Sequence, residues 1–113
     1  MLSKPLRMKR NTQFNYTFKN GKYEQLGCLA IVTNKKRYRE QKIGVVVNKK
    51  IGNSVTRNRT KRLLREAIRS NLEFINKDID ILLVARIGID KWDYAKINSC
   101  LKELLKKSNV LIV

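Results

Sequence analysis

The fold of this chain is decided by residues 49–65, which read KKIGNSVTRNRTKRLLR. Two lysines and a glycine break at Gly52 precede a segment whose apolar residues recur with the period of a helix. At 100° per residue, one face of this helix collects Thr60, Leu63, Leu64, Ala67 and Ile68. That face predicts a helix packed against the protein core.

Basic side chains gather on another side of the same helix: Arg57, Lys61 and Arg65 at spacing i, i+4 and i+8, with Arg62 and Arg69 beside them. A solvated surface is the usual explanation of such a row. Here Glu66 is the only nearby acid, and guanidinium and ammonium groups suit a surface dense in phosphate. We interpret this side as a nucleic-acid-binding surface.

The whole chain is strongly basic. It has 113 residues, with 26 Lys and Arg against 9 Asp and Glu, a formal net charge of +17 and a pI near 10.4. Self-repulsion on this scale favours a polyanionic partner. Because 42% of the residues are hydrophobic, we expect a folded chain with one domain over residues 1–113.

Three apolar, β-branched segments predict strands at residues 28–33, 43–47 and 79–85. Continuous apolar runs in the last two predict strands that are covered on both faces. With three helices, the element order is helix, strand, strand, helix, strand, helix. This order predicts an α/β (α+β) two-layer sandwich with one strand-helix-strand crossover at residues 43–85.

The first and last helices follow from capping residues. Asn11 is predicted to cap a short helix through Lys19, with Gly21 as its left-handed exit. Asp93 is predicted to cap the last helix, whose core-facing stripe is Ile97, Cys100, Leu101, Leu104 and Leu105. The apolar tail, Val110 to Val113, fits either an edge strand or packing under the last helix.

Residues that carry protein-based catalysis are scarce. The chain has no histidine, which argues against a metal-independent ribonuclease. Asp78 with Asp80, and Asp90 with Asp93, lie at a strand start and a helix start, where acids serve turns and caps. No phosphate loop of the nucleotide-hydrolase type is present. We therefore expect no catalytic residue and no metal site in the protein.

The sequence favours a cytoplasmic location. No apolar run approaches the length of a membrane span, and residues 1–10 lack the hydrophobic segment of a secretory signal. Cys28 and Cys100 lack a metal-ligand spacing and are predicted to be reduced core thiols.

Two features of the sequence allow more than one interpretation. Residues 49–53 form either an ordinary strand-to-helix turn or a phosphate contact at a helix amino end. Phe14 and Phe18, at spacing i, i+4, most often indicate core packing. Because basic residues surround them, they also fit stacking on a single-stranded nucleic acid.

Residues 49–65 closely resemble the signature of the protein subunit of bacterial ribonuclease P, and Arg57-Asn58-Arg59 matches the RNR motif of that family. The resemblance extends to the helix bearing Phe14 and Phe18 and to residues 81–86. It implies a small α/β sandwich in a ribonucleoprotein that removes the 5′ leader from precursor tRNA. It also implies a crossover of the uncommon left-handed sense, opposite to general statistics.

By this resemblance, RNA is the catalyst, Mg²⁺ is held mainly by the RNA, and the partners are the catalytic RNA and precursor tRNA, with no membrane and no small-molecule substrate. The residues expected to contact the catalytic RNA are Lys49, Lys50, Asn53, Arg57, Asn58, Arg59, Lys61, Arg62 and Arg65. The residues expected to contact the leader, in a cleft between the first helix and the sheet, are Phe14, Phe18, Lys19 and Arg86. Several relatives carry a leader-facing aromatic where this chain has Val32, which predicts weaker stacking at that point.

Two alternatives explain the charge without a role in cleavage. A structural, ribosomal-type RNA-binding protein fits the composition equally well, but it has no need for a separate single-strand groove. A duplex DNA-binding module would insert the basic helix into a major groove. That helix lies between sheet strands and lacks a preceding helix and short turn, which disfavours the second alternative.

Overall fold

A computed structural model describes residues 11–37 and 39–112, with side chains from residue 15 onward. Its helices and strands are α1 (Asn11–Asn20), β1 (Lys22–Leu26), β2 (Leu29–Lys35), β3 (Ile43–Val46), α2 (Ser54–Asn71), β4 (Ile79–Ala85) and α3 (Tyr94–Lys107). Within the described residues, short 3-10 helices lie in the connections: η2 (Lys49–Ile51), η3 (Leu72–Phe74) and η4 (Ile89–Lys91).

The sheet has the strand order β1-β2-β4-β3. β1 pairs with β2 and β2 with β4 in antiparallel fashion, whereas β3 and β4 are parallel. Two parallel neighbours need a crossover connection, and α2 provides it. The predicted strand-helix-strand unit at residues 43–85 is therefore confirmed, while the left-handed sense of its crossover stays a prediction.

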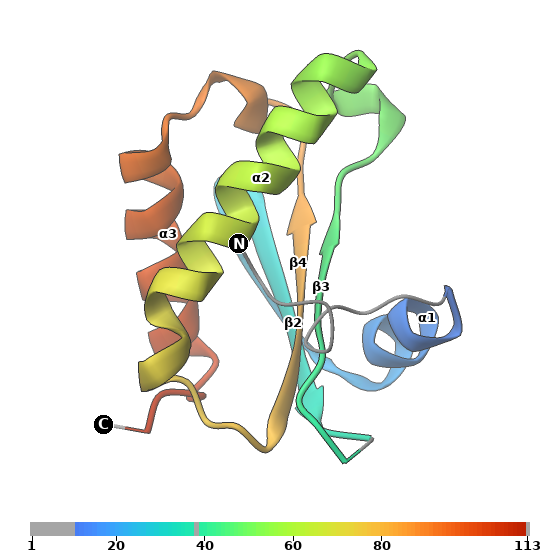
Figure 1. Ribbon diagram of the computed structural model, residues 1–113, viewed down its shortest axis with the longest axis vertical. Coiled ribbons are helices and arrows are strands. Elements are labelled where there is room, and N and C mark those ends of the chain that lie inside the picture. The colour runs from blue at the N-terminus through green and yellow to red at the C-terminus, as the bar shows by residue number, and fades with distance from the viewer. Residues whose placement is uncertain (1–10, 38, 113) are drawn as a thin grey trace.

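The helices lie on both faces of the sheet. Figure 1 shows α2 and α3 side by side on one face and α1 on the opposite face. Strand β2 is accordingly buried at every residue from Leu29 to Thr33, and β4 at every residue from Asp80 to Ala85. The prediction of a strand covered on both faces is therefore confirmed for β4, and in β3 Ile43, Gly44 and Val45 are buried while Val46 is partly buried.

Both long helices bury the predicted residues. On α2, Thr60, Leu64, Ala67 and Ile68 are buried, and Leu63 packs against the core from a partly buried position. On α3 all five residues of the predicted stripe are buried, and the Asp93 side chain accepts a hydrogen bond from Lys96 N at 2.9 Å. Apolar periodicity and one cap therefore explain most of this face of the core.

One strand was missing from the prediction. β1 precedes the expected first strand, which itself runs over Leu29–Lys35 instead of residues 28–33. β1 reads KYEQL, is mostly exposed at the sheet edge, and lacks the apolar signature used to find strands. Its hairpin to β2 turns at Gly27, whose φ of 60° suits a two-residue turn with glycine in the first position.

The predictions at the ends of α1 were also wrong. Asn11 is the first residue of the helix and not its cap. Gly21 does not adopt a positive φ, which among the described glycines is found at Gly27, Gly52 and Gly88. Gly21 is required by space instead: an added Cβ would lie 2.5 Å from both Thr17 O and Val32 Cγ1.

The apolar tail packs under the helices. Val110 is buried, Leu111 forms an isolated antiparallel bridge with Ile75, and Ile112 N donates a hydrogen bond to Phe74 O at 2.9 Å. The tail thus closes the core beside η3 without adding a strand. Val113 lies outside the described residues.

Asp80 fixes the loop between β2 and β3. Its carboxylate is 4% exposed and accepts hydrogen bonds from Lys42 N at 2.8 Å and Arg37 N at 3.4 Å. Burial raises the pKa of Asp80 above its ordinary value of 3.8, although these hydrogen bonds and nearby lysines oppose the shift. The predicted role of this acid in a turn is confirmed.

We expect Asp80→Asn to change the pH dependence of stability. Because the native pKa of Asp80 lies above the unfolded one, the native state binds the proton more tightly, and the free energy of unfolding falls as pH rises from about 4 through the native pKa. The variant lacks this titration. Urea unfolding at several pH values should show the wild type losing stability relative to the variant over this window, and an increase in relative stability would contradict the pKa shift.

Candidate nucleic-acid interface

The entry to α2 is built by two asparagine caps. The Asn48 side chain accepts a hydrogen bond from Lys50 N at 2.8 Å, and the Asn53 side chain accepts one from Thr56 N at 2.9 Å. Ile51 is buried between them, which anchors η2 to the core. Lys49 and Lys50 are therefore held on a rigid turn with exposed side chains. The Asn53 oxygen already serves the helix, so its amide group is the part left for a ligand.

The basic residues of α2 fall into two groups. Asn58, Arg59 and Arg62 are exposed, as is Arg69 further along the helix. The row of Arg57, Lys61 and Arg65 is half-buried along the side of the helix. Arg57 is fixed there by a hydrogen bond from Nε to Gly52 O at 3.2 Å. The most accessible basic surface is thus next to the predicted row and not identical with it.

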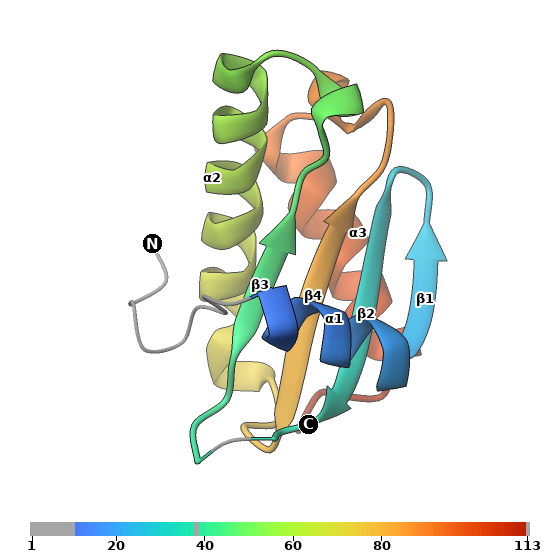
Figure 2. The same ribbon diagram turned by 90° about the vertical axis from the view of Figure 1, so that its right-hand side faces the viewer.

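A cleft lies between α1 and α2 along the edge strand β3. It encloses about 420 Å³ and is lined by Asn15, Phe18, Val45, Val46, Val47, Lys61 and Leu82. Figure 2 shows α1 crossing the sheet face in front of β3, β4 and β2. The cleft combines an aromatic ring, an apolar floor and a lysine, the combination that binds a single-stranded nucleic acid.

Phe18 and Lys61 come from helices on opposite faces of the sheet and meet in this cleft. Phe18 is 51% exposed, so core packing does not explain it. Lys19 is exposed at the end of the same helix. Phe14 belongs to α1, but its side chain lies outside the described part of the structure.

Tyr23 and Arg86 extend this surface on the other side of Phe18. The rings of Phe18 and Tyr23 have centroids 6.5 Å apart and an interplanar angle of 64°. Arg86 Nη2 donates a hydrogen bond to Tyr23 Oη at 2.6 Å, and its Cζ lies 5.7 Å from the ring centroid. The Tyr23 hydroxyl donates in turn to Gln25 Oε1 at 2.7 Å. The sequence analysis did not identify Tyr23 because it did not predict β1. The only sequence signal for this residue was an aromatic two positions after Gly21, which follows α1.

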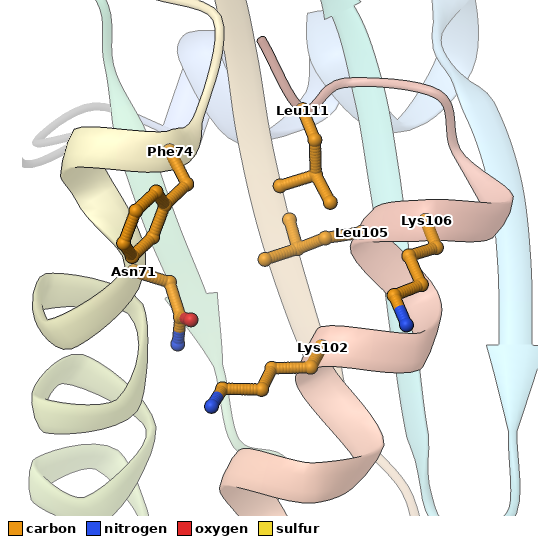
Figure 3. A pocket seen from close by; sticks show the side chains of 6 residues that line it. All are labelled: Asn71, Phe74, Lys102, Leu105, Lys106 and Leu111. Atoms are coloured by element: carbon orange, nitrogen blue, oxygen red, sulfur yellow. The ribbon is translucent and has the colours of Figure 1, made fainter. Parts of the chain in front are cut away.

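A second cavity lies on the opposite side of the molecule. It encloses about 350 Å³ beside the end of α2, the carboxyl half of α3 and the tail, and Figure 3 shows the side chains that line it: Asn71, Phe74, Lys102, Leu105, Lys106 and Leu111. None of the predicted site residues belongs to it. Its exposed Phe74 and two lysines of α3 provide matched controls for the basic and aromatic residues of the cleft side.

Three aspartates of the described residues have structural partners. Asp80 and Asp93 accept backbone hydrogen bonds, and Asp78 pairs with Lys36 at 3.4 Å. In residues 11–37 and 39–112 no group of three or more His, Cys, Asp or Glu side chains comes together as a metal site would require. Nor does any helix within these ranges have the length and apolar character needed to cross a membrane.

Comparison with known proteins shows which family this chain matches. A family model described as Ribonuclease P matches residues 2–109. The ribonuclease P protein component of Clostridium botulinum strain 657 is 35% identical over 105 residues, covering 92% of this chain and 95% of that protein. The ribonuclease P protein component of Natranaerobius thermophilus is 36% identical over 110 residues, covering 97% and 96%.

Solved structures agree with the sequence relatives. The ribonuclease P protein of Staphylococcus aureus superposes with a TM-score of 0.84 at 28% identity, covering 93% of this chain and 96% of that one. The ribonuclease P protein of Thermotoga maritima superposes with a TM-score of 0.79 at 30% identity, covering 89% and 96%. The mixed sheet with three helices is therefore the architecture of both proteins.

Proposed function

This chain belongs to the ribonuclease P protein family, and from that premise we propose which surfaces carry out its function. As a member of this family, the chain is the protein component of a ribonucleoprotein endoribonuclease that acts in tRNA 5′ processing, and the family implies RNA binding. These findings favour neither a ribosomal-type RNA-binding protein nor a duplex DNA-binding module.

The first surface is the proposed contact with the catalytic RNA. It consists of the rigid turn at Lys49 and Lys50 and the exposed side of α2, with Asn58, Arg59 and Arg62. The exposure of these cations on a chain of net charge +17 supports the assignment, because phosphate contacts need accessible guanidinium and ammonium groups. Arg57 and Arg65, half-buried at its margin, complete the surface. Lys61 was expected on this surface from the sequence, and we reassign it to the cleft because it lines that cavity.

The second surface is the cleft between α1 and α2, the proposed site of the single-stranded 5′ leader of precursor tRNA. The observation that carries this proposal is the meeting of Phe18 and Lys61 over an apolar floor. An exposed ring stacks on a base of any sequence, while the lysine neutralises a backbone phosphate. Lys19 and Arg86 are the further cations beside this path.

We assign magnesium to the RNA and not to the protein. Metal-ion catalysis needs ligands that hold the ion in a defined geometry. The described acids are dispersed, and the oxygens of Asp80 and Asp93 already accept backbone hydrogen bonds, so these residues do not fit a magnesium site. The role proposed for the protein is to bind and orient RNA, in the cytoplasm expected from the sequence.

The test is cleavage of a precursor tRNA by the cognate catalytic RNA at low magnesium concentration, with and without the protein. The mixture should cut at the mature 5′ end far faster than either component alone. Phe18→Ala should weaken binding of the leader-bearing substrate by about 5- to 50-fold while leaving mature tRNA binding unchanged, the loss expected of one stacked base. A protein that binds RNA without improving cleavage would overturn the proposal.

A further inference from the structure

We propose that Tyr23 is a second base-stacking residue for the 5′ leader and that Arg86 positions its ring. This inference rests on the proposed leader cleft and extends it across the sheet, from Lys61 beside the β3 edge to Tyr23 on the β1 edge. Phe18 lies between them and touches both parts.

The strand register places Tyr23 on the same face as the cleft. Tyr23 is paired with Val32, and paired residues of an antiparallel sheet point to the same face. Val32 belongs to a small apolar cluster with Ala30, Leu82 and Val84, and Leu82 also lines the cleft. Tyr23 therefore stands on the α1 side of the sheet, next to the proposed leader path.

Val32 leaves its part of the sheet without a surface for base stacking. Val32 is 1% exposed and aliphatic, so it has no surface on which a base could stack. By the family resemblance, several relatives carry an aromatic at this point of the sheet, and its replacement by Val32 predicts weaker stacking there in this chain. Tyr23, directly opposite Val32 on the neighbouring strand and 41% exposed, supplies a ring one strand further out.

The two rings are arranged for two different bases. A base held between two rings needs parallel planes separated by twice the stacking distance of about 3.4 Å. Phe18 and Tyr23 instead meet edge to face, at 64°. Each ring must then offer its exposed surface to its own base, and centroids 6.5 Å apart suit neighbouring nucleotides of an unstacked strand.

Arg86 fixes the ring and adds a cation. Its hydrogen bond to the Tyr23 hydroxyl and its position near the ring restrict the rotation of an otherwise exposed side chain. Because this side chain is already ordered, binding loses less conformational entropy, which favours affinity. The guanidinium also places positive charge where the backbone of a stacked nucleotide would pass.

The experiment measures binding by the reconstituted holoenzyme of a precursor tRNA blocked at its cleavage site with a 2′-deoxy residue, relative to mature tRNA. The ratio of the two affinities isolates the leader. Tyr23→Ala should lower this ratio by about 5- to 50-fold, as expected for one base–aromatic stack. Tyr23→Phe keeps the ring but removes the hydroxyl that Arg86 holds, so it should lose less than Tyr23→Ala, roughly 2- to 5-fold. Phe74→Ala, which removes a similarly exposed ring on the far side, should change nothing.

A fluorescent base gives a second readout. With 2-aminopurine placed at successive leader positions, Tyr23→Ala and Phe18→Ala should each relieve quenching, at adjacent but different nucleotides. If Phe18→Ala lowers the affinity ratio and Tyr23→Ala does not, the inference about Tyr23 is wrong while the leader cleft stands. If neither variant lowers it, the leader cleft itself is wrongly placed.

Discussion

The double variant Arg59→Ala/Arg62→Ala is expected to bind the catalytic RNA about 10- to 100-fold more weakly at ~0.1 M salt than the wild type. Both side chains are exposed on α2, and each is free to neutralise a phosphate and release counterions. The logarithm of the affinity falls linearly with the logarithm of the salt concentration, and each lost phosphate contact makes this slope shallower by roughly 0.7 to 0.9. Filter binding or fluorescence anisotropy over a salt series measures both quantities.

The control for this prediction is Lys102→Ala/Lys106→Ala on α3. It removes the same charge from exposed positions on the neighbouring helix α3, beside the second cavity (Figure 3). If binding depends on a surface of α2, the control should retain its affinity within about 3-fold and keep its salt slope. Equal losses in the two double variants would instead mean that only the net charge of the protein attracts the RNA.

Local sequence patterns were sufficient where one face of an element meets the core. The stripes on α2 and α3 and the capping role of Asp93 were predictable because helical periodicity and capping depend on neighbouring residues. The bounds of β4 were also correct, since six of its seven residues are buried and all but Asp80 are apolar. The RNR motif at Arg57-Asn58-Arg59 lies on α2, where Asn58 and Arg59 are exposed, and the RNA surface itself stays a prediction.

Features that depend on distant residues were not predictable. β1 is stabilised by pairing with β2 and not by its own composition, so its polar sequence gave no strand signal. The family resemblance implied a cleft between the first helix and the sheet, but no local pattern showed that three valines around β3 and Lys61 of α2 line it beside Phe18. Tyr23 was hidden for both reasons. The capping roles of Asn48 and Asn53 also became clear only from the structure, because an asparagine side chain in this segment could equally have bound a ligand.

Gly21→Ala is expected to destabilise the protein by about 3 kcal/mol or more. The added Cβ would lie 2.5 Å from Thr17 O and from Val32 Cγ1, and 2.8 Å from Thr33 O. Two of these atoms belong to backbone that is already in use: Thr17 O accepts a hydrogen bond from Gly21 N at 2.8 Å, and Thr33 lies in the β1–β2 pairing. Thr17 O cannot move away without breaking this hydrogen bond, and Thr33 is held in the sheet, so the overlap must shift α1 itself.

Urea unfolding followed by circular dichroism measures this loss, with Lys22→Ala as the control one residue further along the chain at an exposed position. The control should stay within about 0.5 kcal/mol of the wild type. Because Gly21 sets the exit of α1, the variant should also lose more of the leader contribution to binding than of the affinity for the catalytic RNA, which we propose depends on α2. A Gly21→Ala protein of wild-type stability would mean that α1 is free to adjust on the sheet. The alignment of Phe18 with Lys61 would then require bound RNA, and the cleft would not be preformed.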